Sequence, residues 1–235
     1  MNYAVIVASG RGTRMGQNIP KQFMTVNDKP VFLYTLEGFQ SNENIDNVIL
    51  VISEEWRPFV EGYISDNEIT KVEQIVNGGN SVQESIYAGV TALPDEVLTD
   101  DDLVIIHDGV RPIVNQDVLN NVVDDAKQFG QAVSSVPIKD QIQVVSAEHE
   151  STEFLDRAKL VKVTTPQAYH ALWLKGMYDK AYKDEVGFES SDYTNTMLIK
   201  QGVTLHLSVG SDKNLKLTTK EDLDIFNALI SLDEY

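Results

Sequence analysis

The chain has 235 residues, of which 36 are acidic, 19 are basic and none is cysteine, and its formal net charge is −17. This excess of negative charge argues against an extended basic groove for nucleic acid, and the absence of cysteine excludes disulfides, thiolate nucleophiles and cysteine-based metal sites. No apolar run reaches the roughly 18 residues of a membrane span and the first ten residues do not resemble a signal peptide, so we expect a cytoplasmic protein without membrane insertion.

Apolar runs alternate with stretches of helical periodicity along the chain. Runs rich in Val and Ile, typical of buried strands, occupy residues 3–8, 47–53, 72–76, 103–107 and 132–136. Helical spacing of apolar residues occurs at 32–39, 81–93, 118–129 and 219–232, and Asn115 or Asp117 is a candidate cap for the third of these. The alternation predicts an α/β fold, with a Rossmann-like, mostly parallel sheet covered by helices on both faces. The length fits a single domain over residues 1–235.

Residues 138–162 interrupt this alternation. Two short alternating stretches flank an acidic, turn-like centre at residues 148–152, which predicts a projecting β-hairpin arm within the domain. Ile142, Val144 and Val145 would need cover from outside the arm, and a second subunit is the simplest source. We therefore expect a homodimer formed through the arm.

A glycine-rich loop, SGRGTRMG at residues 9–16, follows the first strand and precedes Lys21. Gly10 and Gly12 can adopt positive φ and allow a ligand to approach the backbone, whose N–H groups bind anions. Arg14 and Lys21 add positive charge to a strongly acidic chain, which indicates a local phosphate site. The loop matches neither GxGxxG nor GxxxxGK[ST], so a tight turn with surface arginines remains open on composition alone.

Several motifs together resemble a known family. The stretch ASGRGTRMG followed by PKQF is similar to the start of the sugar-nucleotide pyrophosphorylase superfamily, specifically the cytidylyltransferases that make CDP-methylerythritol or CDP-ribitol. Residues that resemble the family's later motifs follow in the same order: Gly78, Gly79 and Ser85 for GGxxRxxS, residues 107–112 for HDxxRP, 165–167 for TPQ and 214–218 for NxKxT. The similarity extends from about residue 3 to residue 230, and it implies the nucleotide-diphospho-sugar transferase type of fold.

The resemblance implies attack by a polyol phosphate oxygen on the α-phosphorus of CTP, with release of pyrophosphate. Such chemistry needs positioning and charge neutralisation more than a protein nucleophile. By resemblance, Arg14 and Lys21 are the catalytic residues, which stabilise the charge that builds on the phosphates. The residues that the resemblance assigns to the nucleotide are Val7, Ala8, Ser9, Gly10, Gly79, Asn80 and Ser85.

Asp108 directly follows an apolar strand, so its carboxylate is expected at the carboxyl edge of the sheet, where open α/β sheets bind ligands. A Mg²⁺ ion bridging phosphate oxygens needs such a ligand, and we therefore expect Asp108 to bind Mg²⁺ or another divalent cation. The alternative is a turn or N-cap aspartate. We expect His107 to be structural, and Arg111 either to pair with Asp108 or to shape the turn.

The resemblance places Lys216 and Arg157 at the phosphate of the acceptor, with Arg157 reaching the site from the partner subunit of a dimer. The alternatives are a residue flanking a helix cap for Lys216 and a salt bridge within the hairpin for Arg157. The sequence departs from the family at Val82, where a basic residue is usual, and at Gln141 and Tyr193, where Thr and Asp are usual. It leaves open whether the neighbouring Asp192 contributes to metal or acceptor binding.

The favoured acceptor is D-ribitol 5-phosphate, with CDP-ribitol serving the synthesis of cell-wall teichoic acid or capsule. The alternative within the family is 2-C-methyl-D-erythritol 4-phosphate, an intermediate of isoprenoid biosynthesis. A glycosyltransferase of similar topology would need a DxD metal motif, and the acidic run Asp100 to Asp102 precedes a strand instead of ending one. A non-catalytic nucleotide sensor is a further hypothesis, motivated by Val82 and Tyr193.

Overall fold

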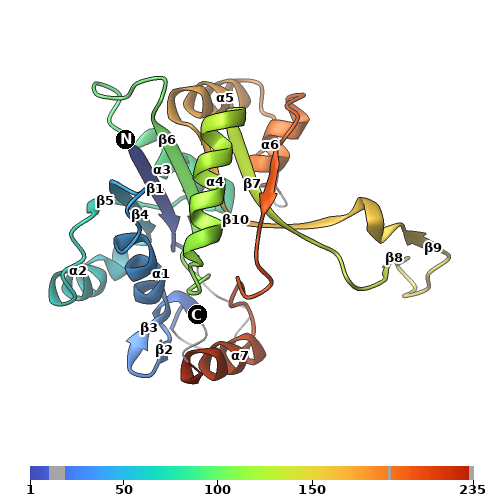
Figure 1. The fold of residues 1–235 in the computed structure, drawn as a ribbon, viewed down its shortest axis with the longest axis horizontal. Helices are drawn as coiled ribbons and strands as arrows, with labels where there is room; N and C mark the ends of the chain where they lie inside the picture. Colours follow the sequence, from blue (N-terminus) through green and yellow to red (C-terminus); the bar gives the residue numbers. More distant parts are fainter. Residues whose placement is uncertain (11–18, 190–191, 233–235) are drawn as a thin grey trace.

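A single seven-stranded sheet forms the centre of the molecule (Figure 1). The computed structural model describes residues 1–10, 19–189 and 192–232. The strand order is β11-β7-β10-β6-β1-β4-β5, and β10 runs antiparallel to both of its neighbours while the other pairings are parallel. Its strands are β1 (Asn2–Val7), β4 (Asn47–Ile52), β5 (Val72–Asn77), β6 (Leu103–Asp108), β7 (Gln131–Pro137), β10 (Val161–His170) and β11 (Leu207–Val209). The predicted mostly parallel sheet is confirmed.

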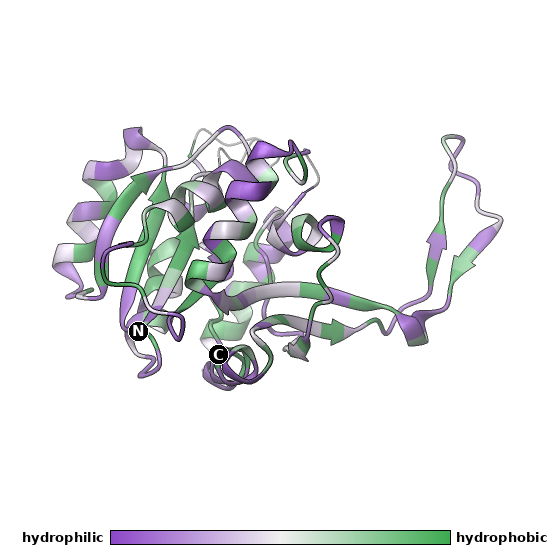
Figure 2. Ribbon diagram, turned by 90° about the horizontal axis from the view of Figure 1, so that it is seen from above, coloured by the Kyte–Doolittle hydropathy of each residue, from purple (hydrophilic) through white to green (hydrophobic). Residues whose placement is uncertain are grey.

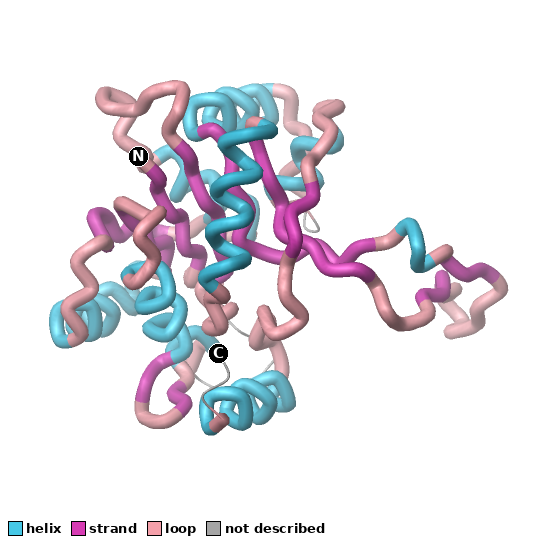
Figure 3. The backbone as a smooth tube through the Cα atoms, in the orientation of Figure 1, coloured by secondary structure: helices cyan, strands magenta, loops and turns pink. Residues whose placement is uncertain are grey.

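Helices cover both faces of the sheet, and α4 crosses one face in Figure 3. The helices are α1 (Val31–Gln40), α2 (Arg57–Asp66), α3 (Val82–Thr91), α4 (Gln116–Phe129), α5 (Ala171–Lys183), α6 (Thr194–Lys200) and α7 (Lys220–Ser231). Successive residues of β1 point to opposite faces: Ala4 and Ile6 pack with α1, α2 and α4, whereas Tyr3 and Val5 pack with α3, α5 and α6. Burial on both faces explains why the central strands are continuous apolar runs.

The ends of the predicted helices follow local signals. Asn115 caps α4, since its side chain accepts a hydrogen bond from the Val118 N–H at 3.0 Å, while Asp117 lies in the first turn. Gly130, with φ of 84°, ends the same helix in the left-handed conformation. No helix in the described part of the chain is long and apolar enough to cross a membrane.

The segment 138–162 forms the arm, which extends away from the body of the molecule (Figure 2). Its strands β8 (Ile142–Val144) and β9 (Glu153–Leu155) pair antiparallel, with Ile142 opposite Leu155. Large apolar side chains of the arm face solvent in the single chain, and Val145 and Phe154 are 60% and 68% exposed. An isolated two-stranded hairpin of this kind has little stability of its own in water.

Helix α7 and helix α1 enclose a third apolar cluster, which fixes the segment leading to α7. Phe226 is fully buried and meets the ring of Tyr34 edge-on, with a centroid separation of 5.2 Å. Leu217 is buried in the same cluster, and its backbone N–H donates to the Val110 carbonyl at 2.9 Å. Packing and a backbone hydrogen bond thus both fix Leu217, and with it the backbone next to Lys216.

Replacing Phe226 with Ala should lower the free energy of unfolding by about 3 to 5 kcal/mol, because a fully buried aromatic side chain is lost and a cavity is left. Ile225 is the matched control, since it lies on the same helix but is 49% exposed. Ile225→Ala should change stability by less than about 1 kcal/mol. Urea unfolding measures both changes, and similar small losses for the two variants would contradict the packing of α7.

Candidate active site

The carboxyl ends of β1, β4, β5 and β6 meet at one edge of the sheet and border a cavity of about 750 Å³. Open α/β sheets bind ligands at this edge. All of the residues predicted to bind the nucleotide line the cavity: Val7, Ala8, Ser9, Gly10, Gly79, Asn80 and Ser85. Lys21, Asp108 and Lys216 line it as well, whereas Arg157 does not. Arg14 lies outside the residues that the structure describes.

The Ser85 hydroxyl joins the loop after β1 to the loop after β5. It donates to the Ser81 carbonyl at 2.9 Å and accepts hydrogen bonds from the Ser9 hydroxyl at 2.9 Å and the Gly79 N–H at 3.1 Å. A Cβ atom at Gly78 would overlap the side chains of Ser9 and Ser85, so the close approach of the loops requires glycine there. The structure gives Ser85 a role in shaping the cavity, and its contact with a nucleotide stays a prediction.

The amino-terminal end of α3 borders the same cavity, as the lining residues Ser81 and Val82 show. Ser81 caps the helix by accepting from the Glu84 N–H at 3.0 Å, and the Glu84 carboxylate accepts from the Asn80 N–H at 2.7 Å. The helix dipole gives this end a positive potential. A phosphate bound near Ser81 would therefore be stabilised without a lysine or arginine at position 82.

Gln22 is a site residue that the sequence did not reveal. Its buried side-chain amide donates to the carbonyls of Ala8 and Gly10 at 2.7 and 2.8 Å, and so fixes the start of the glycine loop. Phe23 stacks on Trp56 with a centroid separation of 4.4 Å. Lys21 begins the short 3₁₀ helix that carries both residues, so its backbone is anchored beside the cavity.

Of Gly10 and Gly12, the two glycines that could adopt positive φ, only Gly10 belongs to the described residues. Gly10 does not adopt positive φ, and a Cβ there would meet no atom of the described residues within 4 Å. Gly12 and Arg11 lie outside the described residues. The freedom of Gly10 to adopt positive φ is therefore not used in this structure.

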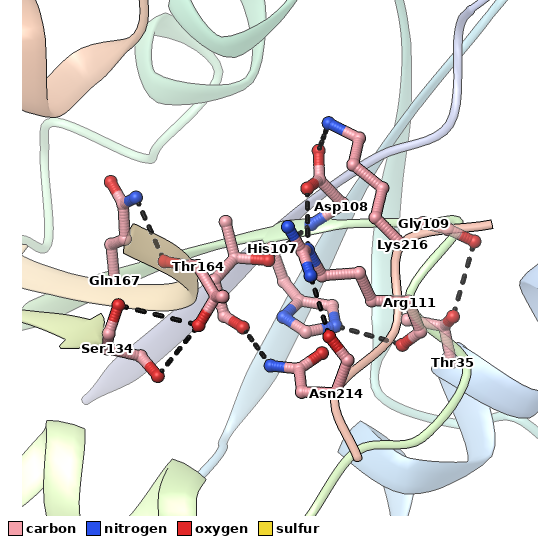
Figure 4. A network of polar contacts seen from close by, with 11 residues as sticks. Thr35, His107, Asp108, Gly109, Arg111, Ser134, Thr164, Gln167, Asn214 and Lys216 are labelled. Atoms are coloured by element: carbon pink, nitrogen blue, oxygen red, sulfur yellow. Dashed lines mark hydrogen bonds and ion pairs between the residues drawn. The ribbon is translucent and has the colours of Figure 1, made fainter. Parts of the chain in front are cut away.

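Asp108 is the centre of an ion-pair network at the end of β6 (Figure 4). Its Oδ1 lies 3.0 Å from Lys216 Nζ and its Oδ2 lies 2.9 Å from Arg111 Nε, so both carboxylate oxygens are paired. Arg111 Nη1 also donates to the Asn214 carbonyl at 2.8 Å. The network thus joins β6 to the segment before α7. Of the two roles expected for Arg111, pairing with Asp108 or shaping the turn, the structure shows the pairing.

The two cations determine the protonation state of Asp108. Burial alone would raise the pKa of this carboxyl group, but Lys216 and Arg111 outweigh it and hold the pKa well below its usual range. The side chain is 15% exposed, so these charges are only weakly screened by solvent. Asp108 is therefore a carboxylate near pH 7.

His107 lies behind this network and is buried. Its Nε2 is 3.1 Å from the Arg111 carbonyl, which can only accept, so Nε2 carries the proton, while Nδ1 has no hydrogen-bond partner among the described residues. Burial lowers the pKa of His107 from 6.5 to about 4. The imidazole is neutral near pH 7 and supports the turn to Arg111, in agreement with the structural role expected for it.

Two of the three residues that depart from the family pattern, Val82 and Tyr193, lie beside Asp108. Val82 and Tyr193 are both partly exposed, and with Val7 and Asp108 they line a small cavity adjoining the larger one. Lys216 Nζ lies 5.6 Å from the centre of the Tyr193 ring. Tyr193 is therefore next to an expected acceptor-binding residue.

Asp192, in contrast, is buried and already paired. Its Oδ2 lies 2.8 Å from Lys200 Nζ and accepts from the Glu189 N–H at 3.0 Å. Burial by itself raises the pKa of Asp192, and its hydrogen bonds to Lys200 and Glu189 lower it overall. These contacts give Asp192 a structural role at the start of α6.

Arg157 lies at the base of the arm. Its Nη1 donates to the Lys139 carbonyl at 2.6 Å, and the ammonium group of Lys139 forms an ion pair with Asp212. Asp212 also pairs with Lys162 at 3.7 Å and lies four residues before Lys216. The arm is thus connected to the segment that carries Lys216.

Comparison with known proteins places these residues in a family context. The family model described as "IspD: 2-C-methyl-D-erythritol 4-phosphate cytidylyltransferase" matches residues 2–231. A ribitol-5-phosphate cytidylyltransferase of Lacticaseibacillus paracasei is 43% identical over 97% of each chain. A 2-C-methyl-D-erythritol 4-phosphate cytidylyltransferase of Clostridium novyi is 35% identical over 97% of this chain and 96% of that one.

The fold is similar to that of solved structures. The 2-C-methyl-D-erythritol 4-phosphate cytidylyltransferase of Francisella tularensis has a TM-score of 0.80 at 25% identity, covering 97% of this chain and 98% of that one. The 4-diphosphocytidyl-2C-methyl-D-erythritol synthase of Anaerococcus prevotii has a TM-score of 0.81 at 22% identity, covering 98% of each. The arrangement of the sheet and its helices is therefore that of these proteins.

Lowering the pH from 7 to 5 should destabilise the protein through His107. Its folded pKa of about 4 lies below the unfolded value of 6.5, so the unfolded chain takes up the proton first and stability is lost as the pH falls through this interval. Between pH 7 and pH 5 the loss due to this group should be about 2 kcal/mol. His107→Gln keeps a donor near Nε2 without a titrating group, so urea unfolding should show a flatter pH dependence. Equal slopes for the two proteins would rule out a buried, neutral His107.

Proposed function

The chain belongs to the IspD family of cytidylyltransferases, which are nucleotidyltransferases, and on this premise we propose that it transfers CMP from CTP to D-ribitol 5-phosphate, yielding CDP-ribitol and pyrophosphate. The observation that carries the choice of acceptor is the higher identity to a ribitol-5-phosphate cytidylyltransferase than to a methylerythritol phosphate enzyme, at equal coverage of this chain. The resemblance would place CDP-ribitol in the synthesis of cell-wall teichoic acid or capsule.

The cavity supplies the groups that this reaction needs. An oxygen of the acceptor phosphate attacks the α-phosphorus of CTP, the bond from that phosphorus to the β-phosphate oxygen breaks, and pyrophosphate leaves with the electron pair. In this proposal Lys21 and Arg14 neutralise the charge that builds on the α-phosphate and the leaving group. The nucleotide lies against the loops that Ser85 joins, with its phosphates near the amino-terminal end of α3.

Asp108 is the carboxylate that we propose as a ligand for Mg²⁺. The group is ionised and borders the cavity, and Mg²⁺ in nucleotide sites often takes one or two carboxylates together with phosphate oxygens. The described residues contain no cluster of three or more acidic or histidine side chains that could hold a metal alone, which favours an ion held largely by the triphosphate. When bound, Mg²⁺ neutralises and orients phosphate oxygens.

Lys216 and Arg157 are the proposed ligands of the acceptor phosphate. Lys216 is paired with Asp108 at the edge of the cavity, where it can exchange this carboxylate for a phosphate dianion. Arg157 does not line the cavity of its own chain, so we propose that it serves the site of a partner subunit. The exposed apolar residues of the arm support such a homodimer.

The second candidate acceptor is 2-C-methyl-D-erythritol 4-phosphate, which the family description and the relative from Clostridium novyi favour. A glycosyltransferase or a nucleotide sensor has less support. Asp102 of the acidic run before β6 is buried and pairs with the amino group of Met1, so it does not form a metal motif at the cavity.

Purified protein should release pyrophosphate from CTP when D-ribitol 5-phosphate and Mg²⁺ are present, and excess EDTA should stop the release. With 2-C-methyl-D-erythritol 4-phosphate the value of kcat/KM should be at least about 10-fold lower, which corresponds to about 1.4 kcal/mol. A coupled pyrophosphate assay measures both rates, and omission of CTP gives the blank. Turnover with the methylerythritol substrate alone would overturn the proposed acceptor.

The mass of the wild-type protein in solution should be about twice the chain mass of 26.2 kDa, which corresponds to a dimer. The Phe154→Asp variant should have a mass closer to that of the monomer. A charge at an exposed apolar arm residue would be buried without a partner in the proposed dimer. Val97→Asp is the matched control, since Val97 is 59% exposed in a loop outside the arm. Sedimentation velocity at micromolar concentration measures the mass, and a monomeric wild-type protein would refute the dimer.

A further inference from the structure

Tyr193 contacts the cation that the proposed function assigns to the acceptor phosphate. Lys216 Nζ lies 5.6 Å from the centre of the Tyr193 ring, within the range of a cation–π contact. The same ammonium group is also 3.0 Å from Asp108 Oδ1. Lys216 therefore contacts both a carboxylate and the face of an aromatic ring at the edge of the cavity.

The backbone of Tyr193 is fixed, so its ring is presented from a defined place. Tyr193 precedes α6, where its N–H donates to the Thr196 hydroxyl at 2.7 Å and its carbonyl accepts from the same hydroxyl at 2.9 Å. The residue before it, Asp192, is buried and paired with Lys200. Yet Tyr193 as a residue is 41% exposed and lines the small cavity beside Asp108.

An aromatic ring and a carboxylate hold an ammonium group in different ways. The carboxylate neutralises the charge of Lys216, whereas the ring attracts the cation through its quadrupole and leaves the net charge in place. When an acceptor phosphate competes with Asp108 for Lys216, the ring can keep the ammonium group in position without reducing its attraction for the phosphate. A flexible lysine without this contact would lose more side-chain entropy on binding the phosphate.

We propose that Tyr193 is a positioning residue for the acceptor phosphate, and that it acts by holding Lys216 at the edge of the cavity. This inference rests on the proposed function in two respects, since it requires a polyol phosphate as the second substrate and Lys216 as a ligand of its phosphate. The aromatic ring carries the effect, so the phenolic hydroxyl group is dispensable. Val82 lines the same small cavity, and its uncharged side chain does not compete with Lys216 for the phosphate.

The test compares Tyr193→Leu, which removes the ring but keeps an apolar side chain, with Tyr193→Phe, which keeps the ring. Tyr193→Leu should raise the KM for the polyol phosphate about 10-fold, within the range of about 2-fold to about 30-fold that cation–π energies allow. The KM for CTP should change by less than about 2-fold, and Tyr193→Phe should match the wild type. Tyr182→Leu, at an exposed tyrosine of α5 outside the cavity, should also leave both values unchanged.

A double-mutant cycle with Lys216→Ala separates a role through Lys216 from a general effect on the fold. If Tyr193 acts by holding Lys216, Tyr193→Leu adds less than about 2-fold to the loss caused by Lys216→Ala. A further 10-fold loss in that background, or a Phe variant as poor as the Leu variant, would overturn the inference. The kinetics use whichever polyol phosphate the wild-type protein turns over, so a wrong choice of acceptor leaves this test intact.

Discussion

The ion pairs of Asp108 hold the site together. A carboxylate at the end of a buried strand is stable only when cations compensate for its loss of hydration, and Lys216 and Arg111 do so with one oxygen each. Lys216 lies 108 residues further along the chain, so this compensation requires the segment before α7 to return to the end of β6. The packing of Leu217 and Phe226 supplies the apolar contacts that keep it there. The ion pair between Asp108 and Lys216 also holds Lys216 at the edge of the cavity, where a phosphate can contact it.

The rest of the cavity is built by close approach of loops. Gly78 and Ser85 allow the loop after β5 to touch the loop after β1, and Gln22 ties the start of the glycine loop through two carbonyl groups. None of these contacts is between charged groups. They set the shape of the cavity, whereas Lys21 and Lys216 add positive charge to its lining.

The strongly acidic composition of the chain makes the few cations around the cavity important for binding phosphates. A chain with a net charge of −17 repels polyanions over most of its surface, so binding of a triphosphate and a polyol phosphate depends on a few local cations and on the end of α3. Asp108 also keeps Lys216 paired in the absence of substrate. A phosphate must therefore compete with a carboxylate, and a neutral ring such as that of Tyr193 can assist without adding a second negative charge.

The sequence by itself determined the parallel core and the order of the site's motifs, because both depend on local patterns. Buried strands are continuous apolar runs, and the residues that follow them lie at one edge of the sheet, which placed Asp108 and the start of the glycine loop at Ser9 and Gly10. Only the tertiary structure decided the antiparallel direction of β10, because its polar TTPQ stretch does not have the apolar pattern of a buried strand. The roles of Gln22 and Tyr193 likewise became visible only in the tertiary structure. A buried glutamine or a tyrosine over a lysine has no local signal, since each is defined by a partner that folding brings from elsewhere in the chain.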